Sequence, residues 1–333
     1  LSTAMLGHSL KRIYEHLGYT TVGINHLGDW GTQFGKMICA YKRWGNKEAV
    51  EQGGVNELVV AGDADSVVCR LLSRPAEGLP QTEPMFDVTA CGSLEGRSTL
   101  RLMRNIVMVN IDPRTYTDVG LKYERDVYAR PQIVIYVNSP SRKALADNAG
   151  RLSAIVRLLN SSEAARYMAE IKPDADKKAA AAVKAVCGRG MYVPAEMRSM
   201  KKGRNFVWIS DNGAERMQNI CVFTIPRDNP TRWVEMCDSA MKANIPGERD
   251  DMSFRLCDDG MTIAALSGHG GKKAMMRGLW QMEGDAMGGP FAALMADDST
   301  HARTIVAAAY AYAPGKKKRN MMRRLEAALR TLE

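Results

Sequence analysis

Residues 51–60 divide the sequence into two parts of different character. The run Gln52-Gly-Gly-Val-Asn56 is typical of a turn-like linker, and the following LVVAGDADSVVCRLL has the pattern of a strand that leads into a helix. At 333 residues, 45% of them hydrophobic, the chain is long enough for two ordinary domains. We therefore expect a short segment at residues 1–52, a junction at 53–59 and an α+β domain at 60–333.

The first part has the pattern helix, strand, loop, helix. Apolar residues recur at helical spacing through residues 5–17 and stop at Gly18, where a C-terminal cap is expected. A short β-branched run at 20–25 leads into the glycine-rich loop 26–32, and helical spacing resumes at 34–44. This order belongs to a parallel α/β layout, yet it offers one strand with no neighbour to pair with. We expect the segment to dock loosely on the larger part or to stay mobile.

The loop INHLGDWGTQFGK carries the sharpest chemical pattern. A glycine-rich turn between a strand and a helix lets the backbone approach a ligand, and the helix presents unpaired N–H groups to it. Asn25, His26, Asp29 and Gln33 would then reach into a cleft. The alternative is structural, because Asp29 can also cap the next helix and the glycines can simply form turns.

The same residues carry a family resemblance. STAMLGHSLKRIYEHLGY followed by INHLGDWGTQFGKMICAYKRWGN closely resembles arginyl-tRNA synthetases just after their first signature. The resemblance implies a fragment of a class I synthetase α/β nucleotide-binding domain and the activity of an arginine-tRNA ligase. It also implies ATP with Mg as cofactor, arginine and tRNA as partners, and Asn25, His26, Asp29 and Gln33 at the amino-acid and ATP cleft.

The family's two signatures are not found in the chain. In the family a His-x-Gly-His sequence comes immediately before the segment that matches Leu1 to Thr3, and we expect coding sequence upstream of Leu1. The Lys-Met-Ser-Lys-Ser type loop and the anticodon-binding helices are absent as well. Phosphoanhydride activation depends on positioned cationic groups, so we expect no aminoacylation by this chain and identify no catalytic residue.

The second part alternates strands and helices irregularly, which predicts a large α+β domain with mixed, mainly antiparallel sheet. Expected strands are 86–90, 105–111, 132–137, 206–209, 220–225, 261–266, 277–283 and 304–311. Expected helices are 141–160, 162–171, 175–186 and an amphipathic closing helix at 319–332. Gly288, Gly289 and Pro290 are expected to form a turn that delivers Phe291 inward.

Several compact motifs in this part resemble an uncharacterised family of bacterial envelope proteins that usually carry a lipoprotein signal. They include GLPQTEPMFDV, RNIVMVNI, YARPQIVIYV, NFVWIS and RGLWQMEGDAMGGPF, and the resemblance covers about residues 57–333. The family has no established activity. The resemblance therefore implies a non-enzymatic envelope module with an unknown ligand or protein partner, and the alternative is an artefactual fusion of two unrelated proteins.

Arg104, Arg277 and Trp280 are the candidate ligand residues of the larger part. Arginine can hold an anion with two hydrogen bonds and tryptophan offers a stacking face, although all three can equally form packed edges of the core. The cluster Lys316 to Arg319 opens the closing helix, where positive charge is disfavoured by the helix dipole. It faces either an acidic partner, membrane headgroups or RNA, or it is a solvated charge run.

Charge and composition constrain the remaining options only weakly. The net charge of +9 is spread along the chain and is compatible with an RNA partner. Seven cysteines without a C-x-x-C pair and five histidines without ligand spacing predict reduced thiols and no metal site. We find no apolar run long enough to span a bilayer and no signal peptide, so the chain as written is expected in the cytoplasm.

Overall fold

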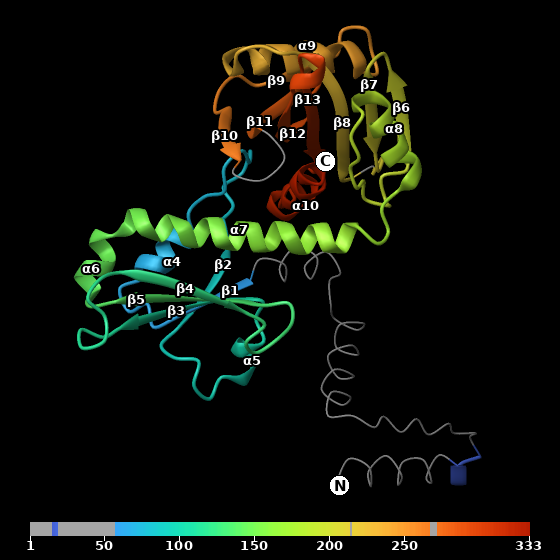
Figure 1. Cartoon of the computed structure of the whole chain (residues 1–333). Coiled ribbons are helices and arrows are strands. Elements are labelled where there is room, and N and C mark those ends of the chain that lie inside the picture. The colour runs from blue at the N-terminus through green and yellow to red at the C-terminus, as the bar shows by residue number, and fades with distance from the viewer. Residues whose placement is uncertain (1–14, 19–56, 214, 267–271) are drawn as a thin grey trace. The chain divides into compact units, whose positions relative to one another are not determined.

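The computed structural model describes residues 15–18, 57–213, 215–266 and 272–333 (Figure 1). The chain divides between Glu51 and Gln52, and residues 52–333 form one compact unit. Of the helix predicted at 5–17, Glu15 and His16 are described and are helical. Gly18 has a φ of +87°, the left-handed conformation common in glycines that follow a helix. The other elements predicted before residue 57 lie outside the described residues.

A five-stranded sheet with the strand order β2-β1-β3-β5-β4 forms the first half of this unit. Three neighbouring pairs, β1 with β2, β1 with β3, and β3 with β5, are parallel, whereas β4 pairs antiparallel with β5. Parallel pairing agrees with the apolar, β-branched sequences of the central strands, which are buried on both faces. The strands are β1 (Glu57–Ala61), β2 (Asp87–Cys91), β3 (Asn105–Ile111), β4 (Gly120–Arg125) and β5 (Ile133–Ser139).

Helices cover one face of this sheet and join it to the rest of the unit. Helices α4 (Val67–Leu72), α6 (Arg142–Asp147) and α7 (Ala149–Ile171) pack against that face, and α5 (Ser98–Arg101) lies in the connection between β2 and β3. Ser141 caps α6 by accepting a hydrogen bond from the Ala144 amide. The long α7 also contacts the last helix of the unit, α10 (Arg319–Arg330), so it is covered from two sides.

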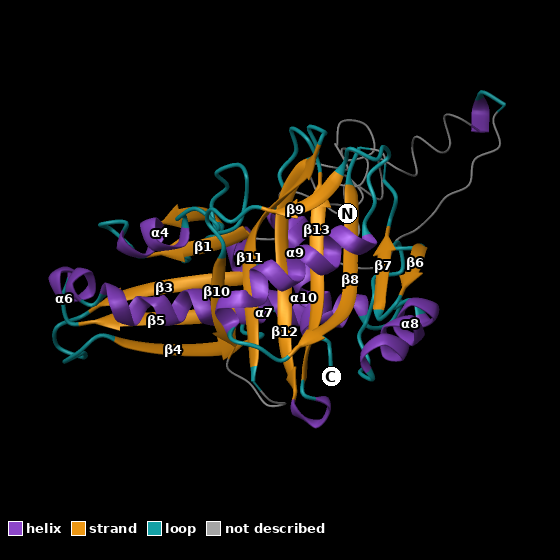
Figure 2. Cartoon of the chain, turned by 90° about the horizontal axis from the view of Figure 1, so that it is seen from above, coloured by secondary structure: helices purple, strands orange, loops and turns teal. Residues whose placement is uncertain are grey.

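An eight-stranded antiparallel sheet forms the second half, with the path β10-β11-β12-β13-β8-β7-β6 and β9 added beside β11 (Figure 2). The long central strands are rich in alanine, valine and methionine and are almost wholly buried. The strands are β6 (Ser199–Gly203), β7 (Phe206–Ser210), β8 (Met217–Pro226), β9 (Ser253–Leu256), β10 (Thr262–Leu266), β11 (Lys273–Glu283), β12 (Gly288–Asp298) and β13 (Arg303–Tyr312).

The two faces of the eight-stranded sheet carry separate cores. Helices α8 (Lys177–Cys187) and α10 cover one face, which we call the closed face, and bury Leu294, Leu325 and their neighbours. Helix α9 (Trp233–Asn244) packs on the other face, the open face, where its Cys237 and Met241 join a core that includes Trp280. The short 3-10 turns η2 (Pro230–Arg232) and η3 (Ser299–His301) precede α9 and join β12 to β13.

The predicted α+β class with mainly antiparallel sheet is confirmed by this architecture. Two details were wrong. The predicted break between helices at residue 161 does not exist, because α7 continues through this position. The break between helices lies at Asn148, which separates α6 from α7. Gly288 to Pro290 begin β12 rather than forming a turn. A Cβ on Gly289 would lie 2.1 Å from the carbonyl oxygen of Ala311, so this glycine permits a close approach of two chain segments.

The basic cluster at the start of α10 is held by the first half of the unit. Lys318 and Arg319 are 4% and 3% exposed, so for these two residues the solvated charge run was the wrong alternative. The Glu83 carboxylate accepts hydrogen bonds from the backbone amides of Lys318 (2.7 Å) and Arg319 (3.2 Å). Arg319 also forms an ion pair with Asp87, 2.6 Å from Nη2 to Oδ2. Glu83 therefore supplies, from a distant part of the chain, the acceptor that the first amides of a helix require.

Candidate functional site

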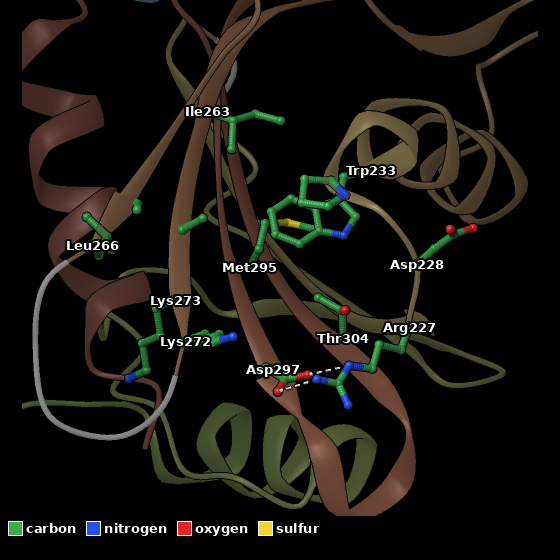
Figure 3. Close-up of a pocket in the computed structure, with 13 residues that line it drawn as sticks. Arg227, Asp228, Trp233, Ile263, Leu266, Lys272, Lys273, Met295, Asp297 and Thr304 are labelled. Carbon is green, nitrogen blue, oxygen red and sulfur yellow. Dashed lines mark hydrogen bonds and ion pairs between the residues drawn. The ribbon is translucent and has the colours of Figure 1, made fainter.

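A cavity of about 490 Å³ opens on the open face of the eight-stranded sheet (Figure 3). We call it the Trp233 cleft. The wall is formed by the start of α9, by β10 and by the ends of β11, β12 and β13. Its lining residues are Arg227, Asp228, Pro230, Trp233, Ile263, Ala265, Leu266, Lys272, Lys273, Ala274, Met295, Asp297 and Thr304.

Small side chains in one row of the sheet create the hollow. Ala265 on β10 is the neighbour of Ala274 on β11, and Ala274 is the neighbour of Met295 on β12. Two adjacent alanines fill little space above the sheet, whereas Trp233 and Ile263 rise on either side. Ile263 is 41% exposed although its side chain is large and apolar. The cleft is thus an apolar concavity of the kind that small molecules occupy.

The indole of Trp233 contains a donor that the protein leaves unused. Its Nε1 is buried and has no hydrogen-bond partner in the part of the chain that the structure describes. A buried donor without a partner costs about 1–3 kcal/mol, so such groups are rare in folded proteins and need an explanation. Asn229 caps the η2 turn by accepting from the Thr231 amide, and this turn delivers Trp233 to the cleft. Because Trp233 lines the cleft, a ligand acceptor that reached this nitrogen would satisfy it.

The polar end of the cleft is lined by charged residues, most of which interact with described partners. Arg227 pairs with Asp297 at 3.2 Å and Asp228 pairs with Arg232 at 2.8 Å, so these charges offset one another. Lys273 turns away, and its ammonium donates to the Leu332 carbonyl at 2.8 Å. Lys272 is exposed, and its ammonium forms no hydrogen bond or ion pair with any described residue, although its backbone carbonyl accepts from the Asp297 amide at 3.1 Å.

The three ligand residues predicted for the larger part lie in different places. Arg104 forms an ion pair with Glu163 on α7, a carboxylate that also accepts from Asn105 (2.7 Å) and Arg166 (2.6 Å). Glu163 is 1% exposed, so the cluster is a buried polar joint between β3 and α7. No pattern in the sequence links Arg104 with Glu163, because 59 residues separate them.

Arg277 and Trp280 lie on opposite faces of β11, since residues an odd number apart in a strand point to opposite sides. Arg277 forms a bidentate ion pair with Glu326 of α10, with both distances 2.7 Å. Trp280 is buried among aromatic rings and stacks on Phe254 with ring centroids 5.4 Å apart. Its Nε1 donates to the Ala311 carbonyl at 3.1 Å. The three candidates therefore do not converge on one cleft, and Trp280 is a core residue.

Arg277 does line a second cavity, of about 410 Å³, which we call the arginine cavity. It lies between α7 and α10, the two helices that join the halves of the unit. Five arginines line it, together with three carboxylates and several apolar side chains. The charged lining residues are Arg157, Arg277, Arg319, Arg323, Arg330, Glu77, Glu163 and Glu326.

The cysteines show no sign of reactive chemistry. Cys221 and Cys237 are fully buried, and burial raises the pKa of the Cys237 thiol to about 12 and that of Cys221 well above its usual value. Among the described residues no cysteine is in a disulfide and no three His, Cys, Asp or Glu side chains gather as metal ligands. In the same residues, no helix is both apolar enough and long enough to traverse a bilayer. Asn25, His26, Asp29 and Gln33 lie outside the described residues.

Sequence reasoning missed the residues that form the Trp233 cleft. The helix α9 was not predicted, although Asn229-Pro230-Thr231 is a start signal and apolar residues follow at helical spacing. The orphan indole N–H had no sequence signal at all, because it depends on what surrounds the ring.

Comparisons with known proteins divide the chain into three parts. Residues 1–62 match tRNA synthetases class I (R), catalytic domain. Residues 53–172 match a domain of unknown function (DUF8532), and residues 176–331 match another (DUF4837).

Relatives of the first part are arginine–tRNA ligases. The chain is 61% identical over 59 residues to that of Clostridium perfringens and 58% identical over 59 residues to that of Alkaliphilus metalliredigens. Each alignment covers 18% of this chain and 10% of the enzyme. The Clostridium botulinum ligase is 31% identical over 152 residues, which is 44% of this chain and 26% of that enzyme. The arrangement suggests a fusion, in which residues 1–62 are similar to the catalytic domain of arginyl-tRNA synthetases and residues 53–172 and 176–331 match two families of unknown function.

Proposed function

We propose that residues 57–333 act as a ligand-binding module and that the Trp233 cleft is its binding site. The observation that carries this proposal is the buried, unpartnered Nε1 of Trp233 in the wall of an apolar cavity. A ligand acceptor would satisfy this donor, and its apolar body would cover the exposed face of Ile263.

The charges of the cleft favour an anionic amphiphile. Lys272 supplies a cation that no described carboxylate pairs with, and the alanine row supplies an apolar floor. A carboxylate head with a short acyl chain combines both requirements. Decanoate is a suitable probe, with decanol as the uncharged comparison and decyltrimethylammonium as the cationic one.

Calorimetric titration of the full chain tests this proposal. We expect decanoate to bind more tightly than decanol, and decyltrimethylammonium to bind least. Trp233→Phe keeps a ring but removes the donor, and should weaken decanoate binding by about 5- to 10-fold, the value of one hydrogen bond. Lys272→Gln should weaken decanoate but leave decanol unchanged, whereas Lys201→Gln, an exposed lysine on β6, should change neither. Equal affinity for the three probes would exclude an anion site, and unchanged binding by Trp233→Phe would exclude the cleft.

A second candidate function attaches to residues 1–62, and their similarity to arginine–tRNA ligases favours it. We infer that this segment corresponds to part of the enzyme's cleft for ATP with Mg and for arginine, with Asn25, His26, Asp29 and Gln33 facing these substrates and tRNA as the acceptor. The matched stretch spans about a tenth of the ligases from Clostridium perfringens and Alkaliphilus metalliredigens. We therefore propose that aminoacylation requires the remainder of such an enzyme and that this chain alone does not catalyse aminoacylation.

Arginine-dependent exchange of pyrophosphate into ATP tests two parts of this proposal. The first is that this chain alone is inactive, and the second is that Asp29 faces the substrates. The chain itself should show no exchange. A Clostridium perfringens ligase in which residues 1–59 of this chain replace the matching stretch should retain exchange, and the same chimera with Asp29→Ala should lose most of it. Exchange by the chain alone would refute the first part, and an active Asp29→Ala chimera would refute the second.

Sequencing of the source DNA across codons 40–75 addresses the fusion. An unbroken reading frame would establish one chain that carries both parts, and a broken one would mean that the two proposals concern separate proteins. The lipoprotein signal and envelope location of relatives of residues 60–333 stay predictions.

A further inference from the structure

We propose that the arginine cavity is a binding site for a small phosphate-bearing molecule. This site is separate from the Trp233 cleft, and the proposal does not depend on it. Its basis is the arrangement of guanidinium groups around a cavity between α7 and α10.

One stripe of α10 provides most of the charge. Residues 319, 323, 326 and 330 are three or four positions apart and therefore share one face of the helix. This stripe holds Arg319, Arg323, Glu326 and Arg330, and all four line the cavity. The opposite face of α10 is apolar and packs on the closed face of the sheet, so the helix cannot turn its arginines away without losing its core contacts.

The carboxylates of the cavity are already engaged. Glu163 accepts from Arg104 and Arg166, which do not line the cavity, and Glu326 is held by both nitrogens of Arg277. Arg319 pairs with Asp87 outside the lining. Glu77 is exposed at the mouth. The remaining arginines of the lining are Arg157, Arg323 and Arg330.

Two of these arginines have donors available. Arg330 forms no hydrogen bond or ion pair with any residue in the described ranges. Arg157 donates to the Ser153 hydroxyl at 3.2 Å and to nothing else that the structure describes. Each guanidinium has five N–H groups in a planar fork, a geometry that suits the oxygens of phosphate.

Arg323 is held in place by residues of the first half of the unit. It donates to the Met85 carbonyl at 2.8 Å and to Asn160 at 3.2 Å, and its guanidinium lies 4.6 Å from the centroid of the Phe86 ring. Burial, followed by repulsion from Arg319, lowers the pKa of Arg323 to about 10. Burial also lowers the pKa of Arg330. A bound anion would offset both effects, because a nearby negative charge favours the protonated form.

The size of the space favours a small molecule over a nucleic acid. A nucleic acid backbone needs an extended, exposed basic surface, whereas this site is a bounded cavity of about 410 Å³. Leu79, Met85, Val156 and Met322 also line it and offer an apolar contact for the organic part of the ligand. Arg157 and Met85 come from the first half of the unit and Arg330 from the second, so one ligand would contact both halves.

Titration with inorganic pyrophosphate at constant ionic strength tests the proposal on the full chain. We expect binding that equal ionic strengths of chloride do not reproduce. Arg330→Gln should weaken pyrophosphate affinity at least about 10-fold, and Arg157→Gln, on the exposed surface of α7, should weaken it by several-fold. The matched control is Arg324→Gln, since Arg324 lies on the same helix but pairs with Glu170 and Glu196 outside the cavity.

Hydrogen exchange distinguishes binding in the cavity from general attraction of pyrophosphate to a basic protein, because only binding in the cavity should slow amide exchange in α7 and α10. Pyrophosphate should slow amide exchange in both α7 and α10 of the unmodified protein and of Arg324→Gln, but not of Arg330→Gln. The proposal fails if chloride competes at equal ionic strength, or if Arg330→Gln, Arg157→Gln and Arg324→Gln all bind like the unmodified protein. Because Arg157→Gln alters an exposed residue, loss of folding cannot account for its effect.

Discussion

The closed and open faces of the eight-stranded sheet differ in how completely helices cover them. On the closed face, α8 and α10 lie over a continuous core of small and branched residues. On the open face, α9 covers only part of the sheet and the Trp233 cleft is left beside it. The same strands build both faces, so the difference arises from the helices and from the alanines in the row below the cleft.

The edge strand β10 shows what this difference teaches. Ile263 and Ala265 line the Trp233 cleft, whereas the intervening Ala264 lines the arginine cavity. Alternation along one strand thus presents apolar residues to two cavities of contrasting chemistry. Exposed apolar residues on a sheet edge usually signal a risk of association, and here they form the walls of two candidate sites.

The largest expected effect separates the two faces directly. Leu294 and Met295 are adjacent on β12, both are nearly fully buried, and they belong to the closed and open cores respectively. Leu294→Ala should lower the free energy of unfolding by about 3–4 kcal/mol, because the closed face retains the cavity. Met295→Ala should cost about 2 kcal/mol and also weaken decanoate binding. Equal losses in urea unfolding would mean that the faces are equally tightly packed.

The next effect concerns the attachment of α10, on which the closed face depends. Glu83→Gln removes the charge that accepts from the first amides of this helix and should cost about 1–2 kcal/mol. Hydrogen exchange should quicken in α10 and leave α9 unchanged. Glu95→Gln, at an exposed position, is the control and should have no effect. Faster exchange in both helices would show that the two faces are not independent.

A smaller, pH-dependent effect on the free energy of unfolding is expected at the turn between β12 and β13, two strands that belong to both faces. Asp298 is the last residue of β12, and its carboxylate accepts hydrogen bonds from Arg303 and His301. The hydrogen bond from Arg303 is the main reason that the pKa of this carboxyl is lowered. In the unfolded chain the pKa is about 3.9, so the carboxylate stabilises the fold above that pH. This stability is lost as pH falls through the lower folded-state pKa.

Asp298→Asn should therefore cost up to about 1 kcal/mol at neutral pH and nothing once the carboxyl is protonated in both states. Urea unfolding of the two proteins between pH 2 and pH 7 measures this difference. A difference that did not shrink at low pH would assign the effect to packing rather than charge.

The smallest effect is expected at the rim of the open face. Ile263→Thr keeps the branched shape at an exposed position, and the free energy of unfolding should change by less than about 0.5 kcal/mol. Decanoate binding should nevertheless weaken, because the cleft loses an apolar wall. A large loss of stability with unchanged decanoate binding would mean that Ile263 belongs to the core and does not form a wall of the cleft.

Local pattern was sufficient to predict many elements of the larger part. The β-branched run 105–111 coincides with β3, and the apolar stripe of the closing helix packs as expected, with Leu325, Ala328 and Leu329 buried. In each of these elements the apolar residues follow a single pattern along the sequence, and that pattern matches the residues that are buried. The predicted joint of two helices at residue 161 failed because α7 is packed on two sides, which removes the one-sided apolar stripe that periodicity detects.

The candidate sites were harder to predict because they depend on pairings across long stretches of sequence. Arg104 with Glu163, Arg277 with Glu326, and Glu83 with the start of α10 are each separated by tens to hundreds of residues. Arg277 lines the arginine cavity, but sequence could not reveal that its charge is taken up by Glu326. The roles of Asn25, His26, Asp29 and Gln33 stay predictions.

The strand order of the eight-stranded sheet has a consequence for synthesis. Strand β8 ends at Pro226, but its neighbour β13 begins only at Arg303 and reaches it after four other strands have been made. During translation β8 therefore presents an unpaired edge while β9 to β12 emerge. An open edge of apolar strand is a template for association with other chains. A nascent chain that stalls within this interval would be at risk of aggregation until β13 arrives and closes the sheet at its centre.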